Sequence, residues 1–500
     1  MRLLFVAIVM IFSGNIGFCQ LGELGVFDNH SDVGKNVKPG SAVYIPATRQ
    51  YVISGAGYNV WADHDEFHFA WKKMKGDFIL TARAQFVGAE GINAHRKIGW
   101  MVRKSLEGNS PHVNAVVHGD GLTSIQYRKS AGAQTGEQKA DLTGADIIEL
   151  ERKGNDYVMR VARYGEPFVT EKLQGLDIGE DVYVGLFVSS HEADVLETGV
   201  FQNVRIVVPA PDTLVPYRQS IGSRMEILEV ASGSREVVFT DPGSIQAPNW
   251  TPDNHSLLYN LQGLIYKFDL QSKNISVLNT GDVKNNNNDH VLSMDGTLLG
   301  LSSGVQALGG SIIYTVPATG GTPKQITPKG PSYLHGWSPD NKYLLFTGMR
   351  NDDFDIYRIP AEGGKELRLT TTKGLDDGSE YSPDGKHIWF NSVRNGTMQI
   401  FRMNADGTGQ VAMTDSSFHD WFPHVSPDGK WVVFLSFMKE EVRPDDHPFY
   451  KHVYLRMMPV TGGKPKVIAY FYGGQGSINT PSWSPDSKRL AFVSNSVLLP

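Results

Sequence analysis

The sequence predicts an all-β protein in which an N-terminal jelly-roll sandwich is followed by a six-bladed β-propeller. Three observations lead to this prediction: a Pro-Asp turn that recurs through the second half, strand-like alternation without a repeat through the first half, and a final repeat that is only half complete. The chain has 500 residues, of which 40% are hydrophobic and 20% charged, as expected for a globular protein of two or more domains.

The repeat is a turn of the type Ser-Pro-Asp between two short apolar runs. Its aspartates are Asp253, Asp295, Asp340, Asp384, Asp428 and Asp486. They lie 42, 45, 44, 44 and 58 residues apart, a period typical of propeller blades with four antiparallel strands each. In the third unit we expect strands at 333–337, 343–347 and 355–359, and a fourth strand that ends at Leu369.

The last unit begins at Ser477 and stops near Ser496 after only two strands. Two strand-like segments without a unit of their own lie upstream, at 224–230 and 235–240. We therefore expect the sixth blade to be built from both ends of the propeller domain, which would leave no open sheet edge.

The N-terminus has the pattern of a secretory signal over residues 1–19. A basic residue, Arg2, precedes an apolar run that is too short to span a membrane, and cleavage is expected before Gln20. The alternative is a lipid anchor at Cys19, which the bulky Phe18 fits poorly. Either reading predicts an exported protein, periplasmic or secreted. Because Cys19 is the only cysteine, cleavage after it would leave a mature chain without disulfides or thiolate zinc sites.

The first half, residues 21–208, reads as strands almost throughout. Strands are expected at 51–54, 67–72, 77–86, 98–103, 113–118, 123–128, 147–152, 157–162, 182–189 and 199–207. Ten strands without a repeat favour a two-sheet sandwich of the jelly-roll type. A Pro-rich linker, 209–221, separates it from a propeller at 222–500, so we expect the two halves to fold separately.

Three runs in the first half, "YVISGAGYNVWADHDEFHFAWKKMKGDFILTARAQF", "KIGWMVRKSLEGNSPHVNAVVHGDG" and "VYVGLFVSSH", resemble the concanavalin A-like (laminarinase-like) sandwich domains of secreted carbohydrate-active proteins. The resemblance covers roughly residues 40–207 and implies contact with glycans. We expect this domain to be non-catalytic. The aromatic residues that could either stack on sugars or lie in the core are Trp61, Trp71, Trp100 and Tyr127. The run Asp63–Glu66 could bind calcium or form an exposed loop.

In the second half, the repeat "WSPD…LLFTG…DIYRIPAEGG…RLT" resembles the WD40-like repeats of the periplasmic TolB family, essentially over 222–500. This resemblance implies a propeller that docks proteins. A sister group, the oligogalacturonate lyases, binds a manganese-type metal through histidines above the central channel. The separate α/β domain of TolB is replaced here by the expected sandwich, which puts a role in the Tol system in doubt.

Alignment of the blades on the turn aspartate places four candidate metal ligands at the start of successive inner strands. They are His290, His335, Glu380 and His424. Imidazole and carboxylate groups suit a divalent Mn, Fe or Zn ion. His290 and His335 lie five residues before the turn aspartate, whereas Glu380 and His424 lie four residues before it. Only an irregular entry loop could therefore bring all four side chains together. The alternative is a polar rim of buried, hydrogen-bonded histidines.

Further polar side chains are expected around the same channel mouth. Asp289, Asp376, Asp377 and Trp421 are candidates for substrate binding, and His419 and His424 are candidate bases. Arg350 and Arg394 follow the second strands of their blades, where each could bind a uronate carboxylate or simply support a turn.

The long interval in blade five places about fourteen extra residues between its second and third strands, most naturally at 438–451. This segment could be a lid, a docking loop or a solvated hairpin. The net charge of −6 argues against a nucleic-acid partner. Two functions follow: an exported cell-envelope protein that binds glycan or protein partners, or a metal-dependent lyase or hydrolase that acts on acidic oligosaccharides.

Overall fold

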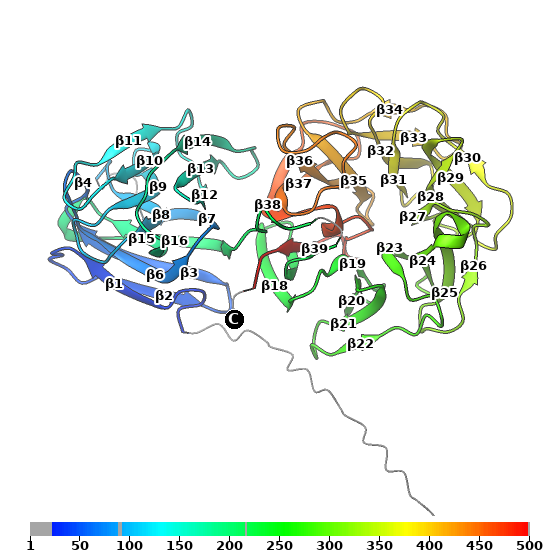
Figure 1. The fold of residues 1–500 in the computed structure, drawn as a ribbon, viewed down its shortest axis with the longest axis horizontal. Coiled ribbons are helices and arrows are strands. Elements are labelled where there is room, and N and C mark those ends of the chain that lie inside the picture. The colour runs from blue at the N-terminus through cyan, green and yellow to red at the C-terminus, as the bar shows by residue number, and fades with distance from the viewer. Residues whose placement is uncertain (1–22, 89–92, 216–217, 499–500) are drawn as a thin grey trace, which may run out of the picture.

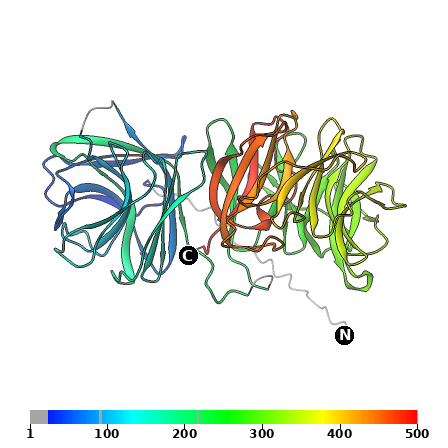
Figure 2. The same ribbon diagram turned by 90° about the horizontal axis from the view of Figure 1, so that it is seen from above.

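The computed structural model describes residues 23–88, 93–215 and 218–498. The expected signal peptide with Cys19 lies outside the described residues. Thirty-nine strands and two short 3-10 helices, η1 (Gln306–Leu308) and η2 (Gln475–Ser477), make up the regular structure of the described chain, so the predicted all-β class is confirmed. Two parts lie side by side, a pair of sheets at the N-terminal end and a ring of blades at the C-terminal end (Figure 1; Figure 2).

The N-terminal part contains sixteen strands. They are β1 (Asn29–Val33), β2 (Ser41–Ile45), β3 (Gln50–Gly57), β4 (Val60–Trp61), β5 (His64–Asp65), β6 (Phe67–Lys75), β7 (Phe78–Val87), β8 (Lys97–Arg103), β9 (His112–His118), β10 (Thr123–Arg128), β11 (Gly136–Lys139), β12 (Ile147–Lys153), β13 (Asp156–Ala162), β14 (Val169–Leu173), β15 (Asp181–Ser189) and β16 (Glu192–Val207). Two seven-stranded sheets have the orders β1-β6-β15-β8-β9-β10-β11 and β14-β13-β12-β7-β16-β3-β2, and β4 and β5 form a small hairpin.

Alternating side chains of the two large sheets share one apolar core. Phe78 and Leu80 of β7 enter it from one sheet, and Trp100 and Val102 of β8 enter it from the other. The alternation has a period of two because successive side chains of a strand point to opposite faces. The ten expected strands are all present. The jelly-roll topology and the relationship to concanavalin A-like domains stay predictions.

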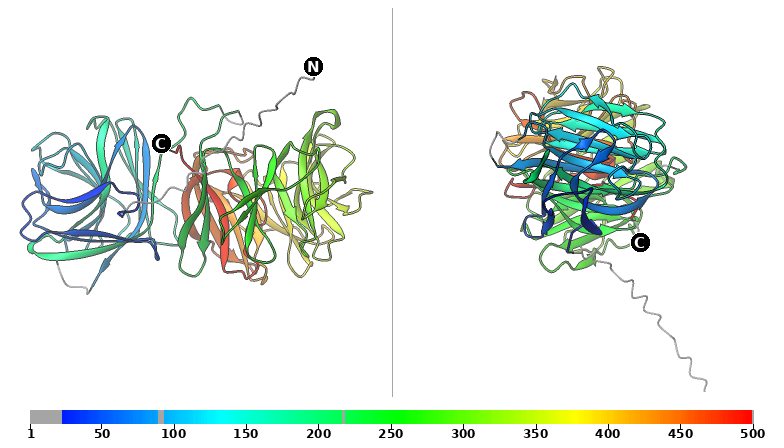
Figure 3. Two further views of the ribbon diagram at one scale, coloured as in Figure 1. Left: turned by 90° about the horizontal axis from the view of Figure 1, so that it is seen from below. Right: turned by 90° about the vertical axis from the view of Figure 1, so that its left-hand side faces the viewer.

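The C-terminal part is a ring of six blades around a central axis (Figure 1), and the blades are seen edge-on in the left view of Figure 3. Five blades have four strands each: β19 (Gln246–Trp250), β20 (Ser256–Leu261), β21 (Leu264–Asp269) and β22 (Ile275–Val277); β23 (Asn286–Leu292), β24 (Leu298–Val305), β25 (Gly310–Pro317) and β26 (Lys324–Gln325); β27 (Ser332–Trp337), β28 (Tyr343–Arg350), β29 (Asp353–Pro360) and β30 (Leu367–Arg368); β31 (Asp376–Tyr381), β32 (His387–Ser392), β33 (Gln399–Asn404) and β34 (Val411–Ala412); β35 (His419–Val425), β36 (Trp431–Phe437), β37 (Lys451–Pro459) and β38 (Lys466–Gly473).

The recurring turn has a local physical cause. In blade three, the hydroxyl of Ser338 donates a hydrogen bond of 2.6 Å to Asp340, and the same hydroxyl accepts one of 2.9 Å from the backbone N–H of Tyr343. These bonds close the turn between the first two strands, and the equivalent hydroxyl–aspartate bond occurs in all six repeats. The sequence repeat therefore marks the turn between the first and second strands of each blade.

The sixth blade joins the two ends of the ring. It contains β17 (Ser223–Glu229), β18 (Ser234–Asp241) and β39 (Arg489–Asn495), and β17 pairs with β39 along its whole length. A bridge between Trp483 and Leu490 marks the innermost strand. The predicted six-bladed closure from both ends of the domain is confirmed.

The two parts meet in an interface that the Pro-rich linker did not lead us to expect. Tyr450 and Tyr472 of blade five pack against Ile79 and Val207 of the N-terminal sheets. The Ala210 N–H of the linker donates to the hydroxyl of Tyr472 at 3.2 Å, which fixes part of the linker to that blade. Separate folding of the halves stays a prediction, but each half would expose apolar surface on its own.

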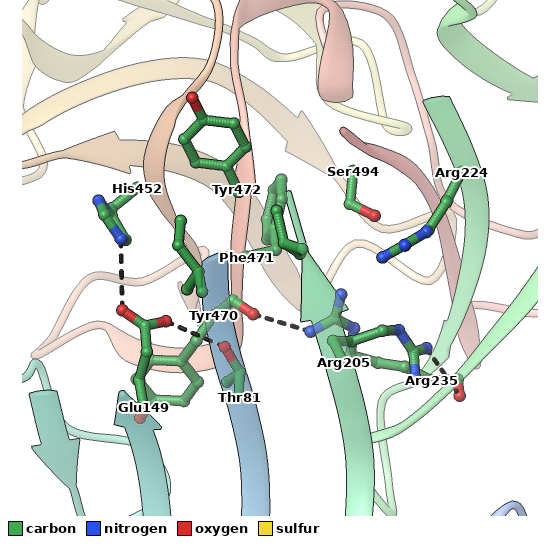
Figure 4. Close-up of a pocket in the computed structure, with 12 residues that line it drawn as sticks. Thr81, Glu149, Arg205, Arg224, Arg235, His452, Tyr470, Phe471, Tyr472 and Ser494 are labelled. Carbon is green, nitrogen blue, oxygen red and sulfur yellow. Dashed lines mark hydrogen bonds and ion pairs between the residues drawn. The ribbon is translucent and has the colours of Figure 1, made fainter. Parts of the chain in front are cut away.

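Charged groups are also buried in this interface. Glu226 of β17 accepts from Arg205 of β16 at 2.7 Å and from Arg235 of β18 at 2.8 Å, and Glu226 is fully buried. Nearby, His452 of β37 faces Glu149 of β12 at 3.3 Å (Figure 4). Between these groups lies a cavity of about 10 Å³, about the space that one water molecule takes.

Candidate functional site at the channel mouth

The inner strands of blades two to five carry a β-bulge near their first residues. The registers shift between Asn286 and His290, between Leu334 and Gly336, between Asp377 and Glu380, and between Trp421 and His424. The irregular strand starts that sequence reasoning required are thus present. In blade four the bulge contains Gly378 at a φ of 65°, where an added Cβ would lie 2.5 Å from the Asn391 side-chain oxygen, so that position needs glycine.

Asp377 is the centre of the charged group at the mouth. Its carboxylate contacts His335 of blade three at 2.9 Å and His447 of the blade-five loop at 3.1 Å, and it accepts a hydrogen bond from the Thr347 hydroxyl at 2.7 Å. Burial opposes ionisation, but the neighbouring imidazoles hold the pKa of Asp377 well below its usual range. Asp377 is therefore a buried carboxylate anion shared by three blades.

His335 is the cation of this group. Burial lowers its pKa, but the attraction of Asp377, followed by that of Asp289, raises it to about 9. The imidazole is therefore charged at neutral pH although only 4% of the residue is exposed. The resulting ion pair links blades three and four.

Asp289 of blade two is a second buried acid that acts on His335. Burial, reinforced by the charge of Asp377, raises the pKa of Asp289 to about 6, although His335 acts in the opposite direction. Asn479 donates to the Asp289 carboxylate at 2.9 Å. Asn479 follows η2 and belongs to the buried start of blade six, so five blades contribute polar groups to one mouth.

The structure separates the four predicted metal ligands. His424 contacts Glu380 at 2.7 Å through Nδ1 and the carbonyl of Ile478 through Nε2, whereas His335 is bound to Asp377. His290 is fully buried, and burial lowers its pKa to about 4, so it is neutral. Within the described ranges, no group of three or more His, Cys, Asp or Glu side chains could hold a metal ion. The metal centre stays a prediction from sequence, and the expected convergence of these four side chains is not found.

The two arginines predicted to bind a substrate carboxylate are bound to acids of their own blades. Arg350 contacts Glu366 at 2.8 Å, and Arg394 contacts both oxygens of Asp376 at 3.0 and 2.9 Å. Asp376, predicted to bind substrate, is thus part of a buried ion pair. Each guanidinium group is paired with a carboxylate because a buried guanidinium needs a fixed anion beside it. The substrate role of all three residues stays a prediction.

The predicted bases also have internal partners. Both ring nitrogens of His424 are engaged as described above. His419 accepts a hydrogen bond from the Met398 N–H at 3.4 Å, and burial lowers its pKa. His419 therefore contacts blade four rather than the carboxylates Asp289 and Asp377.

The blade-five loop, residues 438–450, folds over the mouth and is here called the lid. It connects β36 to β37 and brings His447 to Asp377, with the His447 ring centroid 4.5 Å from that of Trp421. Trp421 itself is only 1% exposed, so it forms a wall beneath the lid rather than an open stacking surface. Sequence reasoning missed His447, although it is the one histidine in the inserted segment.

The lid is attached to the N-terminal part through His452, which directly follows it. His452 faces Glu441 of the lid at 3.4 Å through Nδ1 and Glu149 of β12 at 3.3 Å through Nε2. Burial lowers its pKa, but Glu149 and Glu441 raise it to about 9, so the three groups form a charged contact. The channel mouth and the interface are connected by one short segment.

The N-terminal part has its own polar face. Asn114 of β9 and Gln126 of β10 are buried side by side, and both Asn114 amide atoms lack a hydrogen-bond partner among the described residues. Trp61 at the edge of this face is 37% exposed, with the Lys97 ammonium 5.5 Å from its ring.

Trp100 is fully buried in the core. Asp65 is fully buried and is bound to Arg128 at 2.6 and 2.7 Å, and calcium binding by the run Asp63–Glu66 stays a prediction.

Fold and site together define a two-part β protein: a pair of seven-stranded sheets joined to a closed six-bladed propeller with a lid over a charged channel mouth. The family model of the TolB β-propeller domain matches residues 335–449. An uncharacterized protein of Agrobacterium fabrum is 43% identical over 275 residues, which are 55% of this chain and 92% of that protein. The chain belongs to the TolB-like β-propeller family.

Two solved structures extend the comparison. A TolB candidate of Agrobacterium tumefaciens is 42% identical, with a TM-score of 0.53 over 56% of this chain and 100% of that chain. TolB of Acinetobacter baumannii is 17% identical, with a TM-score of 0.37 over 63% of this chain and 79% of that chain. In the part of the chain that the structure describes, no helix has the length and apolarity needed to cross a membrane.

Proposed function

We propose that the protein is exported and acts in the cell envelope as a binding protein that docks a protein partner at the channel mouth. The leader-like N-terminus supports export, and membership of the TolB-like family supports a docking role for the propeller. The observation that carries the proposal is the charged mouth itself, where Asp289, His335 and Asp377 from three blades converge beneath a lid.

The same geometry favours binding over catalysis. The arginines and the bases predicted for a lyase or hydrolase each contact another group of the chain, and these contacts support a binding role. A recognition site needs fixed charges of defined sign, and the paired groups at the mouth provide them.

Photo-crosslinking in cells tests this function. A crosslinking amino acid at position 440, in the lid, should capture a protein partner, whereas one at position 384, in an exposed turn at the opposite end of blade four, should not. Equal capture at the two positions would contradict docking at the mouth. Fractionation and the mass of the mature N-terminus test export, with Gln20 expected as the first residue.

We propose as a second function that the N-terminal part binds glycan. The exposed indole of Trp61 supports it, because sugars stack on aromatic faces of this kind. In affinity electrophoresis with soluble polysaccharides, Trp61→Ala should lose retardation that the wild type shows. Trp431→Ala is the matched control, since Trp431 of the propeller is also 37% exposed.

A further inference from the structure

We propose that the channel mouth contains a binding site for a basic side chain, lysine or arginine, of the protein partner, and that His447 of the lid fills this site in the chain by itself. The inference rests on the proposed docking function and adds the chemistry of the group that is recognised. It is tested below without the partner.

The contacts of His447 define the site. Its Nε2 lies 3.1 Å from the Asp377 carboxylate, and its ring lies against two aromatic rings, Trp421 at 4.5 Å and Phe422 at 6.3 Å between centroids. A carboxylate on one side and aromatic rings on the other are what an ammonium or guanidinium group requires. His447 therefore occupies a position in which a lysine or arginine side chain would make the same contacts.

The charges of the mouth also require a cation at this place. Asp289 and Asp377 contribute two carboxyl groups, and His335 contributes one fixed positive charge. If His447 moves away, two buried acids face a single imidazolium. Such an imbalance is costly in a buried site, so the departure of His447 is favourable only when a cation takes its place.

The lid is built so that His447 can leave without breaking a blade. The His447 side chain is 30% exposed, whereas the Asp377 side chain beneath it is 7% exposed. The lid lies between β36 and β37 and contributes no strand to the blade. Its outer residues are open to solvent, as Arg443 shows with 80% exposure of its side chain.

The test uses the full chain with His447→Ala and methylguanidinium as the probe, with methylurea as its neutral isostere. Calorimetric titration should give at least tenfold tighter binding of methylguanidinium to His447→Ala than to the wild type, and no comparable binding of methylurea. Arg443→Ala, a lid variant outside the site, should behave as the wild type. Equal binding to wild type and His447→Ala, or equal binding of the two probes, would overturn the proposal.

A second measurement places the probe. In protein with ¹⁵N-labelled tryptophan, the Trp421 indole signal of His447→Ala should shift when methylguanidinium is added, and the signal of Trp431 should not. Binding that leaves the Trp421 signal unchanged would place the cation elsewhere and refute the site. Docking of a partner at the mouth would still stand if the crosslinks from position 440 were found, so the two proposals fail separately.

Discussion

His335 and Asp377, which belong to neighbouring blades, form an ion pair of 2.9 Å between Nε2 and Oδ1 while each residue is about 95% buried. The pair fastens blade three to blade four at the level of the channel mouth. A buried pair of this kind is more costly to break than to replace, because removal of one partner leaves an uncompensated charge.

Asp377→Asn should therefore destabilise the protein by about 3 kcal/mol, because it removes the main anionic partner of the buried His335 imidazole and leaves it Asp289. Urea unfolding measures the effect. The double variant His335→Gln/Asp377→Asn removes both charges and should regain part of the lost stability. A single variant as stable as the wild type would show that the pair contributes nothing to the fold.

The raised pKa values of two histidines predict how stability depends on pH. The pKa values of His335 and His452 are about 9 in the folded chain, above the ordinary value of 6.5. A cation bound more strongly in the folded state stabilises it fully below pH 6.5, and this contribution is lost as pH rises through 9. The thermal midpoint should fall between pH 7 and pH 10, and it should fall less in His335→Gln and in His452→Gln. A midpoint that is flat over this range in the wild type would contradict the raised pKa values.

The interface predicts that the two halves stabilise each other. A fragment of residues 212–500 lacks Arg205, so Glu226 keeps one of its two ion-pair partners, Arg235. We expect fragments 21–208 and 212–500 each to melt cooperatively in calorimetry, but at lower temperatures than the whole chain. The variant Arg205→Met isolates the charge contribution within the full chain. If neither fragment melts cooperatively, the boundary near residue 210 is wrong.

The parts of the fold that depend on local chemistry could be predicted from sequence. The blades were predictable because the bond between Ser338 and Asp340 lies within a single turn, and the closure was predictable because a half unit at each end must pair. The interface could not be predicted in this way, since proline-rich composition says nothing of which faces meet. Glu149 and His452 are about three hundred residues apart in sequence and come together only in the folded chain.

The candidate site, too, could be predicted from sequence only in part. Sequence alignment placed His335 and Asp377 at one mouth, but it could not decide which of two adjacent acids faces inward. Asp376 is bound to Arg394 within its own blade, whereas Asp377 contacts the neighbouring blade. The choice depends on the bulge after Asp377. A bulge changes which face of the sheet the side chains point to, and no reliable sequence signal indicates where one occurs.

Metal analysis decides between the binding proposal and the lyase or hydrolase alternative. We expect the purified full chain to contain less than one Mn, Fe or Zn ion per molecule, because the contacts of His424 with Glu380 and Ile478 occupy both ring nitrogens. A metal ion needs free donor atoms at about 2 Å, and a histidine with both nitrogens engaged offers none.

His335→Ala and Arg443→Ala should be measured beside the wild type, since the first removes a predicted ligand and the second changes only the lid surface. Equal and substoichiometric metal in all three proteins is the expected result. One ion per chain in the wild type and in Arg443→Ala, lost in His335→Ala and on acidification as the imidazoles protonate, would instead establish the metal centre. Because His335 and His424 are bound to separate acids, such a result would require the mouth to rearrange around the ion, and the enzymatic alternative would then take precedence.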